Sequence, residues 1–172
     1  KKKALKVFNV LKDLKKKKQI SKFGFSIYSF KNLIKICKDF KPDILQCPYN
    51  VFDRRLDENE LLKYLSSNKI EIHVRSIFLQ GLLLADYSKL PKKFLKWKSI
   101  FKKFYDWVLH NKVSNLNACY NFIRNNKYID KILIGVDNYS QLKEIISVRR
   151  NRNIKFPDIV VKDEKLINPS KW

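Results

Sequence analysis

The sequence predicts an α/β fold built on parallel strands. Four short, largely apolar runs cover residues 22–28, 44–47, 70–74 and 131–135, and amphipathic helical patterns separate them. Successive runs lie about 20, 28 and 58 residues apart, which leaves room for a helical crossover and exceeds what a hairpin turn needs. Strands that alternate with helices in this way join into a parallel sheet through right-handed crossovers.

The helices follow from apolar residues that recur every three or four positions. The first helix is expected over 1–18 and the second over 29–40, where Pro42 ends it. Acidic residues at 57–60 favour the first turn of a helix that continues through Leu65, because carboxylates complement the positive end of the helix dipole.

The segment 91–110 interleaves lysines with aromatic residues. Its apolar side chains fall on one helical face, which predicts a helix packed over the sheet with its lysines reaching into solvent; they are Phe94, Trp97, Phe101, Phe104, Tyr105 and Val108. The alternative is an amphipathic helix that binds an anionic membrane or a nucleic acid. Ser114 caps a further helix that carries Ile123, and the last helix is expected over 139–148.

We interpret the chain, 1–172, as a single partial domain. Four strand–helix units are about half of an eight-unit barrel, and Met is absent from the sequence, including position 1. We therefore expect a fragment whose N-terminal half is missing. Four parallel strands leave two unpaired edges and one uncovered face, which predicts pairing with the missing half-barrel or self-association.

Composition narrows the function classes. The net charge of +22 suggests nucleic acid as a partner, yet the basic residues are 31 Lys and only 7 Arg, and bidentate recognition of phosphates relies on Arg. Residues 1–22 alone hold ten Lys and one Asp. We interpret the excess as a Lys-rich surface, with a basic nucleic-acid or anionic-surface binding module as the alternative function.

Cysteine usage and hydropathy indicate a compartment. Cys37, Cys47 and Cys119 form no CxxC pair, which favours free thiols in a reducing cytoplasm over disulfides or a metal site. No apolar run approaches the roughly 18 residues of a membrane span, so we expect no membrane partner.

Short motifs at the strand ends carry a family resemblance that covers essentially the whole chain. They are Gly24-Phe25-Ser26, Gln46-Cys47-Pro48-Tyr49-Asn50 with Arg54, Ser76 to Gly81-Leu82-Leu83, and Ile134-Gly135 with Gln141 and Glu144. Their order and strand placement resemble the C-terminal half of an aldo-keto reductase. The ending Leu166 to Trp172 resembles that of members found in bacterial surface-sugar pathways. The resemblance implies strands five to eight of a (β/α)8 barrel.

The resemblance also implies NAD or NADP as cofactor and a small carbonyl, sugar-like substrate. Ser26 and Gln46 would hydrogen-bond the nicotinamide carboxamide, a role that suits polar, uncharged groups. Along the pyrophosphate would lie Ser76, Leu79 and Gly81. The adenosine end would be bound by the loop and helix start that contain Gly135, Val136, Asp137, Gln141 and Glu144.

Three departures from the family pattern bear on function. Ile27 replaces the usual Asn, and Arg75 replaces the aromatic residue that often stacks on nicotinamide. Arg75 could stack as a plane or meet a carboxylate or phosphate of the substrate. Asp137 stands where members that prefer NADP often carry Arg, so we expect NAD to be preferred.

No catalytic residue is assigned. The family's Asp, Tyr, Lys and His lie on the first four strands, and none of those motifs occurs here. Tyr49 belongs to another strand, and His73 is expected to be structural. Asp53, Arg54 and Arg55 are expected to form a salt-bridged loop, with contact to substrate as the alternative. The sequence thus predicts a cofactor-binding half, inactive alone, whose parent transfers a hydride between nicotinamide and a carbonyl.

Overall fold

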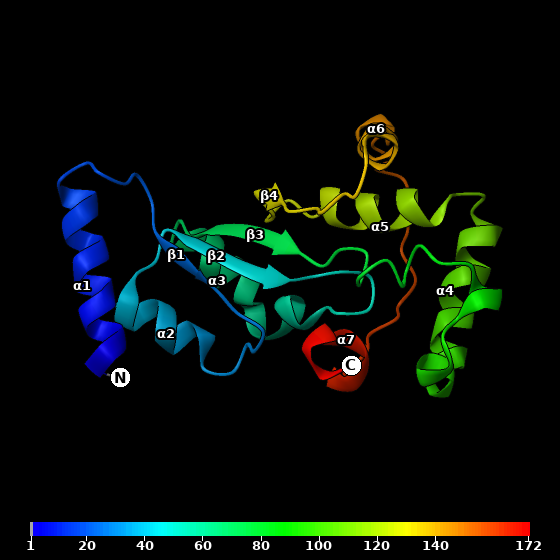
Figure 1. Ribbon diagram of the computed structural model, residues 1–172, viewed down its shortest axis with the longest axis horizontal. Helices are drawn as coiled ribbons and strands as arrows, with labels where there is room; N and C mark the ends of the chain where they lie inside the picture. Colours follow the sequence, from blue (N-terminus) through cyan, green and yellow to red (C-terminus); the bar gives the residue numbers. More distant parts are fainter. Residues whose placement is uncertain (1) are drawn as a thin grey trace.

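The computed structural model describes residues 2–172, with side chains from Ala4 onward. Its four strands form one parallel sheet in the order of the chain (Figure 1). They are β1 (Gly24–Ser26), β2 (Ile44–Pro48), β3 (Glu71–Arg75) and β4 (Lys131–Ile132). The predicted α/β class is confirmed. The fourth strand is shorter than predicted, because the chain leaves the sheet after Leu133, whose N–H donates to the Val74 carbonyl.

Seven α-helices accompany the strands in the described chain. They are α1 (Lys2–Lys16), α2 (Leu33–Phe40), α3 (Leu61–Ser67), α4 (Lys98–His110), α5 (Asn115–Arg124), α6 (Tyr139–Ser147) and α7 (Glu164–Ile167). Short 3-10 segments lie at η1 (Arg55–Glu60), η2 (Tyr87–Lys89), η3 (Lys92–Trp97) and η4 (Pro169–Lys171). Sequence reasoning did not predict α7, although Asp163 caps it by accepting from the Lys165 N–H at 2.9 Å.

Three predicted helices begin or break elsewhere. The second starts at Leu33 because Asn32 adopts a left-handed conformation, with φ of 58°. The acidic residues expected in the first turn of α3 lie in η1, since Asn59 and Glu60 are also left-handed. The basic-aromatic segment is two pieces that meet at Trp97, where φ is −105°.

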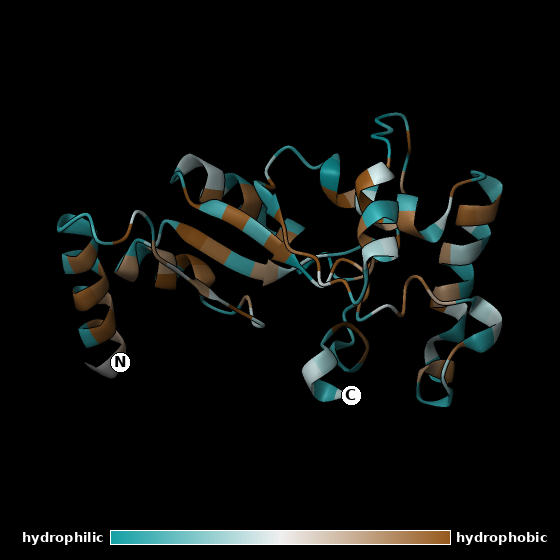
Figure 2. Ribbon diagram, turned by 45° about the horizontal axis from the view of Figure 1, so that its top comes forward, coloured by the Kyte–Doolittle hydropathy of each residue, from teal (hydrophilic) through white to brown (hydrophobic). Residues whose placement is uncertain are grey.

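The sheet has one buried face and one open face. Leu45, Cys47, Ile72 and Val74 are fully buried under the helices. The alternate residues on β2 and β3 are only partly covered, and they include Gln46, His73 and Arg75. The alternation is visible as hydrophobic and hydrophilic bands along the strands (Figure 2). The open face is therefore polar, and the open face and carboxyl edge carry the predicted site.

The aromatic residues of η3 and α4 complete the core. Phe52, in the loop after β2, contacts the rings of Phe101 and Phe104 edge to face, with centroids 5.2 and 5.8 Å apart. All three rings are fully buried. Tyr105 is half-buried, and the other members of the predicted face are buried. The apolar face is buried as predicted, but against the loop after β2 and the neighbouring helical segments: α4 lies at the end of the molecule away from the sheet (Figure 1).

Two Lys-rich helical segments lie at opposite ends of the elongated fold. They are α1 at one end, and η3 with α4 at the other (Figure 1). Several lysines of the second segment cover aromatic rings; the ammonium of Lys96, for example, lies 3.8 Å from the centroid of the Trp97 ring.

Gly24 is required where β1 meets β2. A Cβ added there would overlap the Ile44 carbonyl, which is backbone and cannot move aside. Gly135 offers a matched comparison, since a Cβ added at that position meets nothing within 4 Å.

We expect Gly24→Ala to destabilise the protein by about 1–3 kcal/mol, the range for added volume in a packed site. Gly135→Ala should change the free energy of unfolding by less than about 0.5 kcal/mol. Urea denaturation followed by circular dichroism measures both. Equal stabilities of the two variants would contradict the close approach of β1 to β2.

Candidate functional site

A cavity of about 1110 Å³ opens at the carboxyl ends of β2, β3 and β4. It gathers nine of the eleven residues predicted from the strand-end motifs: Gln46, Arg75, Ser76, Gly81, Gly135, Val136, Asp137, Gln141 and Glu144. In barrels built from parallel strands, chemistry occurs at this end of the sheet.

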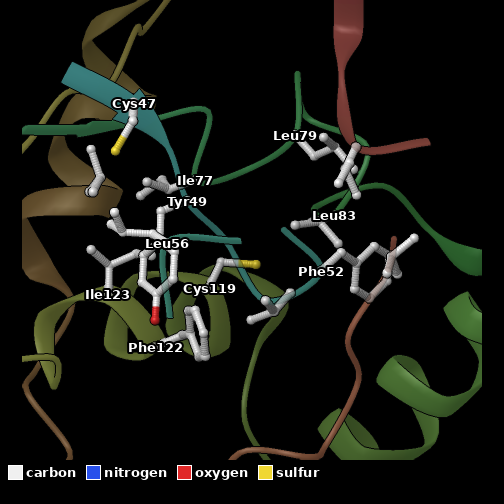
Figure 3. Close-up of a cluster of buried hydrophobic side chains, with 14 of the residues drawn as sticks. Cys47, Tyr49, Phe52, Leu56, Ile77, Leu79, Leu83, Cys119, Phe122 and Ile123 are labelled. Atoms are coloured by element: carbon white, nitrogen blue, oxygen red, sulfur yellow. The ribbon is translucent and has the colours of Figure 1, made fainter. Parts of the chain in front are cut away.

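Two predicted residues lie outside the lining of this cavity. Ser26 is exposed at the end of β1, where its register partner is Gln46. Leu79 has no exposed surface and packs in the core beside Leu83 (Figure 3). A role for Leu79 along a cofactor finds no support, because the apolar side chain is held inside.

The Gln46 amide and the Ser26 hydroxyl are both available to a ligand. Adjacent strands bring the two residues next to each other on the open face. Within residues 4–172, neither side chain has a hydrogen-bond partner. Such a pair can accept from and donate to a neutral amide.

The loop after β3 forms one wall of the cavity through unusual backbone geometry. Ser76, Leu79, Gln80 and Gly81 all have positive φ, between 48° and 79°. Left-handed conformations cost energy for residues other than glycine, and they persist where the surroundings hold them. Here the buried Asn50 amide donates to the Ser76 carbonyl at 3.0 Å, and this hydrogen bond from the loop after β2 holds the first residue of the loop in place.

Arg75 lies at the end of β3 with its guanidinium 4.0 Å from the centroid of the Tyr28 ring. Its Nη2 donates to the Ile27 carbonyl at 3.0 Å, and its Nη1 reaches the Ser76 hydroxyl at 3.4 Å. These contacts hold a cation at the sheet end of the cavity.

The start of α6 forms the opposite wall. Asn138 caps the helix by accepting from the Gln141 N–H at 3.0 Å, and the Gln141 side chain accepts from the Asp137 N–H at 2.8 Å. The Asp137 and Glu144 carboxylates remain exposed at this wall. The cavity thus has a cationic end at the sheet and an acidic end at α6.

Sequence reasoning missed the contribution of α5 to the cavity. Its first residues, Ser114, Asn115 and Leu116, line the wall between the other two. In the sequence Ser114 was recognisable only as a helix cap, which it is, since it accepts from the Asn117 N–H at 3.1 Å. No local signal brings α5 to the site, because the preceding η3 and α4 position it.

The loop after β2 holds its own shape through partly buried hydrogen bonds made by Asp53, Arg54 and Arg55. Asp53, fully buried, accepts two hydrogen bonds of 2.8 Å from the Arg55 guanidinium. Arg54 instead donates to the Pro157 carbonyl at 2.7 Å and stacks over Phe122. The predicted salt-bridged loop is confirmed for Asp53 and Arg55, and the Arg54 contacts are structural.

We expect Asp53→Asn to destabilise the fold by about 3 kcal/mol, the lower end of the range for a broken buried pair, because the half-buried Arg55 guanidinium keeps only the more exposed Glu164 carboxylate, 3.5 Å from its Nη1. The matched change Asp106→Asn breaks the exposed pair with Lys102 and should cost less than about 1 kcal/mol. Chemical denaturation of both variants measures the difference, and equal losses would refute a supporting role for the buried pair.

The three cysteines are free and buried. Desolvation raises the pKa of Cys37 to about 11 and that of Cys47 to about 12, and it also raises the pKa of Cys119. Burial likewise raises the pKa of Tyr49, whose hydroxyl donates to the Asp57 carboxylate at 2.8 Å. These groups are structural, and the cysteines are free thiols as predicted. His73 is also tied down, 3.3 Å from the Glu71 carboxylate.

The raised thiol pKa values predict alkaline destabilisation. The unfolded thiols ionise above about pH 8.5 while the folded ones stay protonated, so the unfolded state binds fewer protons and stability falls as pH rises. Each thiol contributes a slope of about 1.4 kcal/mol per pH unit up to its folded pKa. Urea denaturation between pH 8 and 10.5 measures the slope. A triple Cys→Ala variant should lose this part of it, and an unchanged slope would refute the assignment.

In the part of the chain that the structure describes, no helix is long and apolar enough to cross a membrane. Nor do the described side chains include a group of three or more His, Cys, Asp or Glu residues placed to hold a metal ion.

The parallel α/β units and the cavity at their carboxyl ends are typical of barrel enzymes, whose active sites lie at that end of the sheet. The sequence model of the aldo/keto reductase family matches residues 1–162 of this chain. The chain therefore belongs to the aldo-keto reductase family. No curated protein matches the sequence.

Solved structures share the fold. The holo form of an aldo-keto reductase from Bacillus halodurans superposes with a TM-score of 0.62 at 16% identity, over 86% of this chain and 50% of that chain. Glycerol dehydrogenase from Gluconobacter oxydans gives a TM-score of 0.53 at 15% identity, over 87% of this chain and 55% of that chain. The chain therefore spans about half the length of these structures.

Proposed function

We propose that the chain is the C-terminal, cofactor-binding half of an NAD(P)-dependent aldo-keto reductase. The observation that carries the proposal is the gathering of nine strand-end residues around one cavity. The bound nicotinamide would supply or accept the hydride. The residues of this chain bind and orient it, and they place a small carbonyl substrate beside it.

Each wall of the cavity suits one part of a dinucleotide. Gln46, with Ser26 beside it, offers free polar groups to a carboxamide. The backbone of the loop after β3 would hold the pyrophosphate, and Asp137 and Gln141 at the start of α6 would bind the adenosine; all of them line the cavity. A carboxylate at Asp137 accepts a ribose hydroxyl and repels a 2′-phosphate, which favours NAD over NADP.

The proton that completes carbonyl reduction has to come from elsewhere. A general acid must lie within hydrogen-bond reach of the forming alkoxide. None of the tyrosine, lysine or histidine side chains in the described chain lines the cavity. The catalytic set is therefore supplied from outside this chain segment, and the segment alone is inactive.

Exposed apolar residues favour a complementary half-barrel as the partner. Five of them lie on the first helix and on the helix that follows β4: Leu5, Val7 and Val10 on α1, and Leu142 and Ile146 on α6. A second set of parallel units that pairs with β1 and β4 would cover the unpaired edges of the sheet. The same edges lead us to expect self-association of the chain when that half is missing. Free thiols fit a reducing, cytoplasmic location.

A nucleic-acid or anionic-surface module is the less supported function. Bidentate recognition of phosphates relies on Arg, and the chain has 31 Lys and only 7 Arg. Tight polynucleotide binding that weakens steeply with salt, without affinity for NADH, would favour it instead.

Cofactor titration tests the proposed function. We expect NADH to bind with a dissociation constant below that of NADPH, measured by the fluorescence of the reduced nicotinamide. Asp137→Asn should reduce the ratio of the NADPH to the NADH dissociation constant by about tenfold, because it removes the charge that repels the 2′-phosphate. Asp39→Asn on α2, outside the cavity, is the control and should leave both constants unchanged. Absence of NADH binding would sink the cofactor assignment, and tighter binding of NADPH would sink the role of Asp137.

A further inference from the structure

Arg75 is a half-buried cation without a counter-ion. It lines the cavity at the end of β3, and within residues 4–172 no carboxylate oxygen lies within 4.0 Å of its guanidinium. Removing an arginine from water is costly unless a negative group compensates it. Arg55 shows the usual solution in this same protein, because it forms a two-bond pair with Asp53.

The Arg75 guanidinium is fixed in one orientation by its contacts with neighbouring residues. One of its faces stacks on Tyr28, and its Nη2 is fixed by the Ile27 carbonyl. A guanidinium has five N–H donors, and the described contacts use only Nη1 and Nη2. The Nε–H remains without a partner among the described residues. A planar fork with unused donors is suited to a carboxylate or a phosphate.

The charges of the cavity direct an anion to this end. Its two carboxylates, Asp137 and Glu144, belong to the wall formed by the loop after β4 and α6. That wall repels an anionic group. Among the residues that line the cavity, Arg75 is the one with a permanent positive charge. An oxyanion is therefore attracted to the end of β3, beside Gln46.

We propose that Arg75 determines substrate specificity by binding the carboxylate or phosphate of an anionic carbonyl compound. The inference rests on the proposed function, in which the nicotinamide lies beside Gln46 and the reacting carbonyl lies next to it. Arg75 then binds the anionic end of the substrate and orients its carbonyl towards the nicotinamide. Neutral aldehydes of the same size lack that contact.

Two pairs of compounds that differ in one anionic group test the proposal. They are succinic semialdehyde against butanal, and glyceraldehyde 3-phosphate against glyceraldehyde. Dissociation constants are measured by isothermal titration calorimetry on the protein, with and without NADH. We expect the anionic member of at least one pair to bind about tenfold tighter or more, as charge-assisted hydrogen bonds imply. The pair that shows this preference identifies a carboxylate or a phosphate as the group.

Variants assign the preference to Arg75. Arg75→Gln should abolish it, and a circular dichroism spectrum and urea midpoint equal to those of the wild type show that the variant is folded. Arg75→Lys should keep part of it, because a charge remains without the planar fork. Arg152→Gln, an exposed arginine outside the cavity, is the matched control and should keep all of it.

The outcomes separate this proposal from the proposed function. If Arg75→Gln retains the full preference, or if the wild type shows none, Arg75 is no anion site even where NADH binds. If Arg75→Gln weakens ADP-ribose about tenfold while the compound pairs are unaffected, Arg75 binds the cofactor phosphates and the proposal is overturned. A third outcome is that the wild type prefers the anionic compounds through Arg75 and yet shows no binding of NADH. That result supports the anion site and contradicts the cofactor assignment.

Discussion

The buried amide of Asn50 is the constraint on which the site depends. Its oxygen accepts from the Phe52 and Asp53 N–H groups at 2.9 Å, and its nitrogen donates to the Ser76 carbonyl. One side chain thus closes the loop after β2 and fixes the strained loop after β3. Because Asp53 in turn holds Arg55, which donates to the Tyr28 carbonyl, the end of β1 belongs to the same network. The geometry of three strand ends follows from contacts beneath them.

The sheet was predictable from sequence where burial is regular. β2 and β3 match the predicted runs closely because Leu45, Ile72 and Val74 alternate with partly covered residues on a two-sided sheet. Local conformations were not predictable in the same way. Nothing in the residue types of 29–32 shows that Asn32 turns left-handed and delays α2, and the short β4 ends where tertiary contacts stop. The spacing of apolar residues indicates which face of an element is buried, but it does not indicate where the chain changes direction.

The candidate site divides along the same line. Residues at strand ends could be placed from sequence, because carboxyl ends of parallel strands meet at one edge. A motif gives no direction for a side chain, and that of Leu79 lies in the core and does not line the cavity. The first turn of α5 was overlooked because its position depends on η3 and α4. Their aromatic face packs on Phe52, far away in sequence.

The net charge of +22 contributes little to the site, and its distribution explains why. The chain has 31 Lys and 7 Arg, and within residues 4–172 only Arg75 among them lines the cavity. A long-range positive field is screened by salt within about 8–10 Å, but a fixed guanidinium in a half-buried cavity is screened far less. Selectivity for a ligand therefore lies with the local arrangement of Arg75, Tyr28 and Ile27. Because those contacts join β3 to the chain after β1, residues of this segment alone fix the orientation of the Arg75 guanidinium.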